Sequence, residues 1–514
     1  MDAHDAAVAS VAARIEEFYH DKIPFRVYHG STNSTHKSIR TQHNVVDTSG
    51  LNHVLAVDVS KKTIVVEPNV PMDTLVEATL EYNLVPLVVM EFPGITCGGG
   101  FSGTSGESSS FRYGLFDATV NWIEIVLANG KITRASKTHQ PDLFWGAASA
   151  FGTLGIITSL EINLKEAKRY VALTYYHLSN ISRTVSFLQD RVHKNADDYL
   201  DAITYAKDST IVCIGRLTDD LPKNIQPRQL RRARDPWFFV HVDRVRKRIP
   251  EDGDPSSTLT DYIPLTDYLF RYDRGAFWTG KYAYKYFITP FNRITRFILD
   301  PFMQTRVMYR AMHKSGMVDY YMIQDVAVPY NEAEDFVAWL ETQFGLYPLW
   351  LCPLRTSRES SNSAHGILSE FGHPGAPPML NIGIWGPLSF NRKQAIAQNR
   401  KLEQHLTDIG GKKWMYAQGY YTPAEFWKVH DLNSYSSLRS KYHAEYLPNV
   451  YDKVNVNVAA EEATSKASLT AILLTLFWSI WPIRGLYGVF WTLFAQDYLL
   501  NRTSGAVLQR VKSQ

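Results

Sequence analysis

Residues 94–114 carry a run of glycine and hydroxyl side chains that could bind an anion. Glycine stands at positions 94, 98, 99, 100, 103, 106 and 114, and serine or threonine fills many of the places between them. Glycine lets the backbone adopt positive φ and approach a ligand closely, and successive amides form a concave donor surface for phosphate. The hydroxyl groups add further donors. We therefore predict that this loop holds a pyrophosphate group.

Two other interpretations account for the loop less well. A flexible linker is not usually bordered by apolar runs such as residues 84–90 and 122–127. The spacing Gly98-x-Gly100-x-x-Gly103 also matches the dinucleotide fingerprint of doubly wound folds, with Asp117 at a tolerable distance. That fingerprint requires a helix that begins at its third glycine. The Thr-Ser-Gly-Glu-Ser-Ser-Ser sequence after Gly103 is poor in helix formers, so we reject that fold.

Size and composition exclude several classes of protein. The 514 residues suffice for about two to four domains of roughly 150 residues, and 45% hydrophobic against 20% charged residues describes a folded chain. The net charge of +3 is too small to indicate a nucleic-acid partner, and the basic runs at 228–234 and 244–248 are more typical of a solvated or lipid-facing surface. The three cysteines are too dispersed for a disulfide framework or a thiolate metal site. We expect no nucleic acid, no metal and a reducing compartment.

The elements around the glycine loop are predicted as short strands with few helices. An amphipathic helix at residues 2–22, without the pattern of a signal peptide, precedes a strand that runs into a Gly/Ser/Thr/Asn turn within residues 24–35. This turn is a second candidate phosphate loop. A further helix is expected at 71–82 and a hairpin turn at Asn129-Gly130. Strands are expected at residues 54–59, 63–67, 120–127 and 132–135.

The C-terminal part carries two apolar stretches, at residues 468–481 and 485–494. Pro482 and Arg484 lie between them, and neither stretch has the ~20 residues that cross a bilayer. An arginine at the centre of a single span would cost about 2.5–3.5 kcal/mol on insertion scales. We therefore expect a re-entrant hairpin or a pair of helices in the membrane interface. A buried core helix is the alternative.

Several of these motifs occur together in one known group of proteins. The turn at His29-Gly30, the Gly98-Gly-Gly100 loop, Asn129-Gly130 and the segment at 142–158 together resemble the FAD domain of the vanillyl-alcohol-oxidase/p-cresol-methylhydroxylase (PCMH) flavoproteins. Within that domain, the sequence GTSGESSSFRYGLF at 103–116 resembles the Δ24-sterol reductase branch. The resemblance extends to the C-terminal half of that branch in three blocks, at residues 324–329, 347–353 and 416–427.

The resemblance implies an α+β fold in successive parts. These are an N-terminal amphipathic helix at 1–22, a PCMH-type FAD-binding domain at 23–165, an α+β substrate (cap) domain at 166–455, and a hydrophobic membrane-associating segment with a tail at 456–514. Hydroxyl residues follow Gly30 where relatives with covalent flavin have a histidine, so we expect non-covalent FAD. His29 is the residue that could instead bind the flavin covalently. The implied FAD ligands are His29, Gly30, Ser31, Thr32, Asn33, Ile95, Thr96, Gly98, Gly99, Gly100, Gly103, Thr104, Ser105, Gly106, Glu107, Ser108, Gly155 and Ile157.

The chemistry that the resemblance implies is reduction of the Δ24 double bond in a sterol side chain. NADPH would reduce the FAD, a hydride from flavin N5 would reach one alkene carbon, and a protein acid in a dry pocket would protonate the other. Because no second nucleotide fold is visible, NADPH and the sterol are expected to use the same flavin face in turn. The candidate acids, each of which could instead be structural, are Tyr416, Tyr420, Tyr421, Asp325 and Glu425.

Other activities of the same scaffold stay open at this point. One is an FAD-dependent isomerase or desaturase acting on a sterol or terpenoid in specialised metabolism. Another is an oxidase whose flavin is reoxidised by oxygen, and a third is a sterol-binding protein without flavin. For an enzyme with a lipid substrate, we expect attachment to a membrane through the C-terminal segment, at the endoplasmic reticulum, with the catalytic domain in the cytosol.

Overall fold

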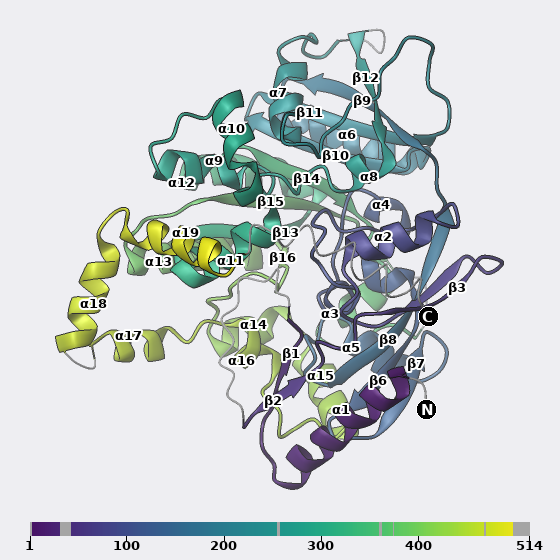
Figure 1. Ribbon diagram of the computed structural model, residues 1–514, viewed down its shortest axis with the longest axis vertical. Coiled ribbons are helices and arrows are strands. Elements are labelled where there is room, and N and C mark those ends of the chain that lie inside the picture. Colours follow the sequence, from purple (N-terminus) through teal and green to yellow (C-terminus); the bar gives the residue numbers. More distant parts are fainter. Residues whose placement is uncertain are drawn as a thin grey trace.

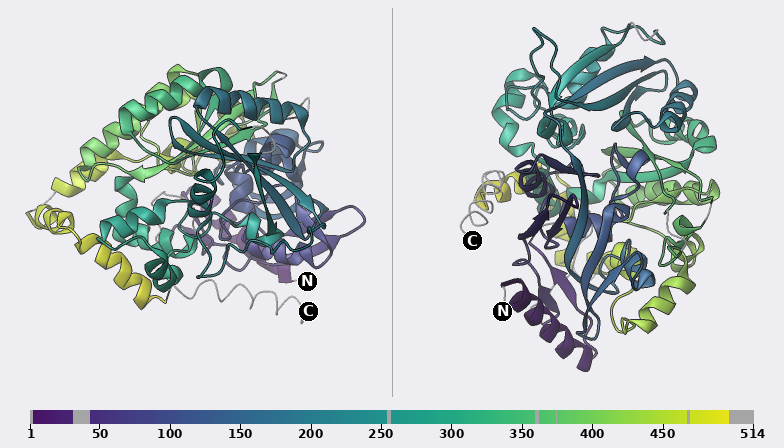
Figure 2. Two further views of the ribbon diagram at one scale, coloured as in Figure 1. Left: turned by 90° about the horizontal axis from the view of Figure 1, so that it is seen from above. Right: turned by 90° about the vertical axis from the view of Figure 1, so that its right-hand side faces the viewer.

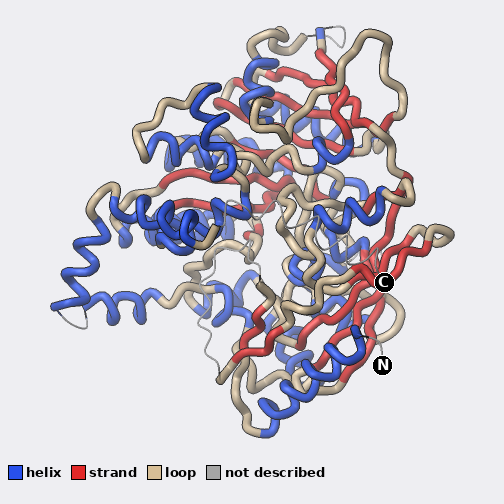
Figure 3. Tube along the Cα trace, viewed as in Figure 1, coloured by secondary structure: helices blue, strands red, loops and turns tan. Residues whose placement is uncertain are grey.

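The computed structural model describes residues 3–30, 43–253, 257–358, 362–373, 375–466 and 469–496. These residues form two large antiparallel sheets with helices around them, and a helical extension on one side (Figure 1). The strands of both sheets are red in Figure 3, which separates them from the surrounding helices. The mixed α/β architecture predicted from the sequence is confirmed. The predicted ligands Ser31, Thr32 and Asn33 lie outside the described residues.

The first sheet belongs to the N-terminal unit, by which we mean the elements from α1 to β8. Its pairings are antiparallel, and β5 (Leu84–Pro86) pairs with β8 beside the main path. The strands lie in the order β3 (Val54–Asp58), β4 (Thr63–Val66), β8 (Gly155–Glu166), β6 (Val120–Leu127) and β7 (Ile132–Ser136). β1 (Arg26–Tyr28) and β2 (Val45–Asp47) form a separate parallel pair. The strands predicted in this part are confirmed.

Helices of the N-terminal unit cover this sheet. α1 (Ala3–His20) confirms the predicted amphipathic helix: Val8, Val11, Ile15 and Phe18 of its apolar face are buried, and Ala12 is half-buried. α2 (Met72–Leu80) confirms the second predicted helix. The remaining helices of the unit are short: α3 (Cys97–Ser102), α4 (Ser110–Tyr113) and α5 (Pro141–Ala147).

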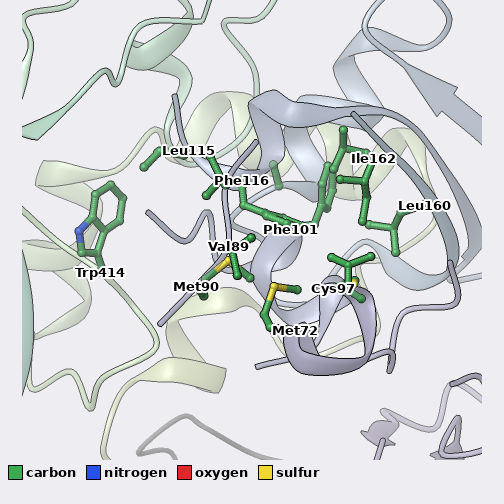
Figure 4. Close-up of a cluster of buried hydrophobic side chains, with 14 of the residues drawn as sticks. Met72, Val89, Met90, Cys97, Phe101, Leu115, Phe116, Leu160, Ile162 and Trp414 are labelled. Carbon is green, nitrogen blue, oxygen red and sulfur yellow. The ribbon is translucent and has the colours of Figure 1, made fainter. Parts of the chain in front are cut away.

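The glycine loop is packed tightly against the rest of the N-terminal unit. Cys97 and Phe101 of α3 point into a cluster of buried apolar side chains (Figure 4). α3 ends at Ser102, immediately before Gly103, where the dinucleotide fingerprint would require a helix to begin. Within this fully described loop, positive φ occurs at Thr104 and Gly114, and not at the glycines 98, 99, 100, 103 and 106. Those glycines instead supply space: a Cβ added to Gly98 would lie 2.6 Å from Pro68 Cβ.

The second sheet is built from the middle and later parts of the chain. Its neighbouring strands are antiparallel. The order is β12 (Leu259–Pro264), β9 (Tyr170–Leu178), β11 (Ser209–Thr218), β10 (Tyr199–Ala206), β14 (Leu349–Leu354), β15 (Met379–Pro387), β13 (Tyr321–Pro329) and β16 (Lys412–Lys413).

The two faces of the second sheet serve different cores. Alternate residues of a strand point to opposite faces. On β13, Met322 and Val326 pack in a core with helices, whereas Ile323 and Ala327 join the core shared with the N-terminal unit. Asp325 has the parity of Ile323 and therefore faces the N-terminal unit. The helices that pack on the Met322 face of the sheet are α6 (Ile181–Lys194), α12 (Ala333–Phe344) and α13 (Arg392–Asp408).

After β16 the chain returns to the N-terminal unit. α14 (Pro423–Val429), α15 (Leu432–Lys441) and α16 (Val450–Val454) follow, and α15 packs against α5. The Tyr435 hydroxyl donates to Thr153 Oγ1 at 2.7 Å. Lys441 and Asp142 form an ion pair at 2.6 Å. The C-terminal part of the chain thus contacts the same unit as its beginning.

Further helices lie between β11 and β13 and after α16 in the chain. They include α7 (Phe238–Arg246), α8 (Leu265–Leu269), α9 (Thr279–Tyr286), α10 (Arg293–Leu299) and α11 (Thr305–Ser315). α17 (Val458–Lys466), α18 (Leu469–Ser479) and α19 (Ile483–Phe494) form the extension, drawn in yellow-green and yellow in Figures 1 and 2.

The predicted break between the two apolar stretches is present. α18 ends at Ser479 and α19 begins at Ile483, on either side of Pro482. α19 packs along α11, and the Arg484 guanidinium lies 3.4 Å from the carbonyl oxygens of Ser315 and Gly316 at the end of α11. Arg484 is therefore turned toward the protein. None of the helices that the structure describes is both long enough and apolar enough to cross a membrane.

Replacing Gly98 by alanine is expected to destabilise the protein by ~1–3 kcal/mol, because the new methyl group would press on the rigid ring of Pro68. Denaturant unfolding of the purified variant measures this. Gly50→Ala is the matched control, since a Cβ at Gly50 would meet no atom within 4 Å. Equal stability of Gly98→Ala and wild type would show that the loop can move away from Pro68.

Candidate functional site

A cavity of about 370 Å³ lies between the N-terminal unit and the second sheet. Backbone and small side chains of the glycine loop line one side of it, together with residues 155–157 at the start of β8. Residues of β13, β14 and β15, of α11 and of the turn before α9 line the other side. The two halves of the chain thus meet at one cavity.

Many of the residues proposed as cofactor ligands border this cavity. They are His29, Ile95, Thr96, Gly98, Gly99, Gly103, Ser105, Gly106, Gly155 and Ile157. The structure places others away from its lining: Gly30, Gly100, Thr104, Glu107 and Ser108. Gly100 faces Met90 and Phe116 instead, since a Cβ there would lie 2.3 Å from Met90 Cε.

Glu107 and Ser108 belong to a buried polar cluster beneath the loop. The Ser108 hydroxyl donates to Glu107 Oε2 at 2.7 Å, and Arg271 Nη2 lies 3.3 Å from the same hydroxyl oxygen. Arg271 forms an ion pair with Asp201 of β10 at 2.8 Å, and the two side chains are 1% and 0% exposed. The Trp350 indole donates to Asp201 at 3.0 Å. This cluster ties the end of the glycine loop to the second sheet.

Aromatic rings form much of the wall opposite the loop. Phe277 stacks on Tyr272 with ring centroids 3.9 Å apart, and its centroid is 4.1 Å from that of Trp385. Trp350 and Trp414 complete this side of the cavity. Ala276 and Phe277 both have positive φ, at 44° and 61°, which is uncommon for residues with side chains. This left-handed turn brings Phe277 into the cavity wall, and the sequence analysis did not identify it.

Asp325 and Tyr416 lie on the cavity and contact each other. The Tyr416 hydroxyl donates to Asp325 Oδ2 at 2.5 Å, and the Asn381 amide donates to Asp325 Oδ1 at 3.0 Å. Trp414 Nε1 donates in turn to Asn381 Oδ1 at 2.7 Å, which fixes the orientation of the amide. Burial raises the pKa of Asp325 to about 6, although both hydrogen bonds oppose the rise. Burial and the nearby Asp325 charge raise the pKa of Tyr416 well above its ordinary value.

The other three proposed acids lie elsewhere. The Tyr420 hydroxyl donates to Gln418 at 2.7 Å and accepts from Arg392 at 3.0 Å. Tyr421 packs against Phe426 of α14. Glu425 shares a capping box with Thr422 at the start of α14 and pairs with Arg400 at 3.0 Å. None of these three side chains lines the cavity among the residues that the structure describes.

Three charged residues that the sequence analysis did not select also line the cavity: Arg26, Glu91 and Lys453. Glu91 is 7% exposed, and its Oε1 has no hydrogen-bond partner among the described residues. Burial, with the Glu107 charge nearby, raises the pKa of Glu91 well above its ordinary value. Lys453 of α16 donates from Nζ to the Phe151 carbonyl beside the 152–155 turn. The only sequence signal for Glu91 was its position between a buried apolar run and Pro93-Gly94.

Comparisons with known proteins support the resemblance drawn from the motifs. Residues 6–136 match the family model described as FAD binding domain. A Delta(24)-sterol reductase of Macaca fascicularis is 27% identical over 436 residues, covering 83% of this chain and 79% of the relative. The Delta(24)-sterol reductase of Arabidopsis thaliana is 26% identical over 441 residues, covering 79% and 75%. Cytokinin dehydrogenase 6 of Oryza sativa subsp. japonica is 30% identical over 131 residues, a quarter of each chain. The resemblance to the Δ24-sterol reductase branch is confirmed.

The raised pKa of Asp325 predicts a pH dependence of stability. The folded protein keeps a proton on Asp325 that the unfolded chain loses above pH ~3.8. The contribution of this group to the free energy of unfolding is therefore complete below pH ~3.8 and is lost as the pH rises to about 6. Asn cannot titrate. We therefore expect Asp325→Asn to gain stability relative to wild type between pH 4 and pH 7, by about 1.4 kcal/mol per unit of pKa difference.

Urea unfolding at pH 4, 5, 6 and 7 measures this difference. Asp208→Asn, in the exposed turn between β10 and β11, is the control and should show no such trend relative to wild type. A difference between Asp325→Asn and wild type that does not change with pH would contradict a raised pKa of Asp325.

Proposed function

We propose that this chain, a homologue of the Δ24-sterol reductases with an FAD-binding domain, is an FAD-dependent oxidoreductase that reduces the Δ24 double bond of a sterol side chain. The observation that carries the proposal is the position of the Asp325–Tyr416 pair, on the same cavity as the glycine loop. Reduction of an alkene requires a hydride source and a proton donor on the same substrate. The glycine-loop side of the cavity would hold the flavin that supplies the hydride, and Asp325 on the opposite side would supply the proton.

The residues of the cavity fit a flavin dinucleotide held without a covalent bond. Gly98, Gly99 and Gly103 present backbone to the cavity, where side chains would exclude a pyrophosphate. Lys453 adds an amine on the same side of the cavity, beside the 152–155 turn. We expect the adenosine end to lie by residues 155–157 and the pyrophosphate by residues 95–106. When bound, FAD supplies a hydride from N5 after NADPH has reduced it.

Asp325 is the better proton donor of its pair. A pKa of about 6 lies near neutrality, where an acid can both lose and regain its proton, whereas the pKa of Tyr416 is raised far above that range. After Asp325 gives its proton to one alkene carbon, the donors from Tyr416 and Asn381 stabilise the carboxylate. The hydride completes the other C–H bond, so the product gains two hydrogens.

The aromatic wall suits the intermediate stage of this reaction. An isolated alkene has no carbonyl group that could hold negative charge, so we expect protonation to precede hydride transfer. Protonation then places positive charge on the more substituted carbon. The faces of Trp385, Trp414 and Phe277 can stabilise such a charge and exclude water. We expect NADPH and the sterol to enter this cavity in turn and to compete with each other at high concentration.

The proposal places the enzyme at a membrane, because sterols reside there. We expect the endoplasmic reticulum, with the catalytic domain in the cytosol and with residues 468–494 in contact with lipid. Exposed apolar side chains on α18 and α19 support this expectation. The cysteines at positions 97, 213 and 352 are free and buried, which suits a reducing compartment.

Incubation of the enzyme with a Δ24 sterol, FAD and NADPH is expected to give a product heavier by two hydrogens in mass spectrometry. Asp325→Asn should lower the turnover by about 10²- to 10⁴-fold, because it removes the general acid. Tyr420→Phe and Glu425→Gln are matched controls whose side chains do not reach the cavity, and they should retain turnover within a few-fold.

Other results would redirect the assignment. An isomerase gives a product of unchanged mass without NADPH, and an oxidase releases peroxide. A reductase in which Glu91→Gln, rather than Asp325→Asn, removes turnover would move the proton donor to the other buried acid.

The purified protein is expected to be yellow and to release its FAD on heat denaturation. Lys453→Met should weaken FAD binding about 10- to 100-fold in a fluorescence titration of the apoprotein, because it removes the amine that would donate a charge-assisted hydrogen bond to the cofactor. Lys428→Met, which removes an exposed amine at the end of α14, should bind FAD as wild type does. Flavin that stays with the precipitated polypeptide would instead indicate covalent attachment.

A further inference from the structure

Two helices of the C-terminal extension, α18 and α19, expose large apolar residues. On α18, the outward residues are Leu473, Leu476 and Phe477, with Ile480 following, and each is 47% to 57% exposed. On α19 they are Leu486, Phe490, Leu493 and Phe494, each 50% to 69% exposed. The spacing of three or four residues puts each set on one helix face. The face of α19 that contacts α11 carries the small residues Gly488 and Thr492 instead, which is the reverse of an ordinary surface helix.

A third helix, nearly 200 residues earlier in the sequence, shows the same feature. α10 exposes Ile294, Phe297 and Ile298 by 70%, 55% and 64%, again on one face. Ile288, between α9 and α10, is 75% exposed, and Phe390, after β15, is 58% exposed. Single exposed apolar residues are ordinary on a protein surface, but a set from several segments indicates a contact surface.

Tyr286, at the end of α9, contacts both Phe390 and the junction between α18 and α19. Its carbonyl accepts a hydrogen bond from Trp481 Nε1 at 2.8 Å, and its hydroxyl accepts one from Gly485 N at 3.3 Å. Its ring centroid lies 6.1 Å from that of Phe390. The residues just before Ile288 therefore contact both Phe390 and the turn between α18 and α19. Figure 1 shows α9, α10, α18 and α19 on the left-hand side of the molecule.

We propose that these outward faces of α10, α18 and α19, with Ile288 and Phe390, form one surface that docks on a lipid bilayer whose headgroups are anionic. We call it the docking surface. Lys281, Lys285, Arg293 and Lys314 are exposed on α9, α10 and α11. The sequence has neither Asp nor Glu at 275–299 or at 463–496. Apolar side chains bordered by basic ones match an interface with anionic lipid.

A second copy of the chain fits this surface less well. In a two-fold symmetric contact the same patch faces itself, so the lysines and arginines at its border would face each other. The repulsion would oppose such a dimer at low salt, whereas anionic headgroups would neutralise the same charges. The bilayer is therefore the occupant that the charge pattern favours.

The docking surface lies one helix away from the cavity. Met308, Tyr309 and Met312 of α11 line the cavity. The next positions around α11, Ala311 and Ser315, contact Gly488 of α19. A molecule leaving the bilayer at α19 would thus pass α11 to enter the cavity. This part of the inference, delivery of the substrate from the bilayer past α11, rests on the proposed sterol reduction.

Vesicle sedimentation of the full-length holoenzyme tests the docking surface. We expect binding to phosphatidylcholine vesicles that contain phosphatidylserine, and weaker binding to phosphatidylcholine alone. The double variant Phe297→Gln/Ile298→Gln should weaken binding at least tenfold although α18 and α19 are unchanged. Ile132→Gln, an apolar residue of β7 that is 44% exposed, is the matched control and should bind as wild type does. Both variants replace exposed side chains, so equal thermal unfolding midpoints confirm that they are folded.

Charge and oligomeric state are tested separately. Lys285→Glu/Arg293→Glu should reduce binding to the phosphatidylserine vesicles while leaving the weak binding to phosphatidylcholine unchanged. Wild-type binding by the α10 double variant would overturn the inclusion of α10. A wild-type dimer in analytical ultracentrifugation that the α10 variant converts to a monomer, without vesicle binding by either, would show that this surface joins two copies of the chain.

Sterol delivery separates this inference from the proposed function. With sterol supplied in vesicles, the α10 double variant should lose at least five-fold in rate relative to wild type. With sterol supplied in cyclodextrin, the two should react equally, because the cavity is unchanged. Equal loss under both conditions would overturn delivery past α11. If the wild type reduces no sterol under either condition, the proposed function fails, and the vesicle sedimentation still decides whether the surface binds lipid.

Discussion

The buried ion pair between Arg271 and Asp201 holds the two walls of the cavity at a fixed separation. Arg271 reaches the hydroxyl of Ser108 at the end of the glycine loop, and Asp201 accepts the indole N–H of Trp350 in the aromatic wall. Removing one charge of such a pair leaves the other buried without compensation, at a cost of about 3–5 kcal/mol. Movement of the N-terminal unit relative to the second sheet would therefore have a large free-energy cost. Glu107 and Ser108, which the sequence suggested as cofactor ligands, instead sit in the structure that supports the loop.

The acidity of the site follows from strand parity on β13. Gln324 faces α13, where its amide donates to Asn399 at 2.9 Å, and Asp325 faces the opposite way into the cavity. A shift of one residue in the register of β13 would exchange the two side chains. Only the carboxyl that faces the aromatic rings is both buried and supported by Tyr416 and Asn381. The same sheet geometry thus determines which residue has a raised pKa.

Local sequence patterns identified the glycine loop, most strands of the N-terminal unit and the break at Pro482, because each depends on residues that are neighbours in the chain. Asp325 and Tyr416 were candidates from their motifs, and the structure brings them together; their roles, like the domain boundaries, stay predictions. Glu91 and Phe277 could not be recognised, since the first is defined by burial among distant residues and the second by a left-handed turn without a sequence signature. Tyr420, Tyr421 and Glu425 share a motif block with Tyr416, yet the chain direction after Gln418 carries them away from the cavity.

The contribution of α16 to the cavity has a consequence for how the protein is made. Lys453 and Val454 border the same space as the glycine loop, which lies some 350 residues earlier in the chain. On the ribosome, the N-terminal unit is translated long before these residues, so the lining of the cavity stays incomplete until α16 has been made. A cofactor held by both segments can therefore make its full set of contacts only after α16 has been translated.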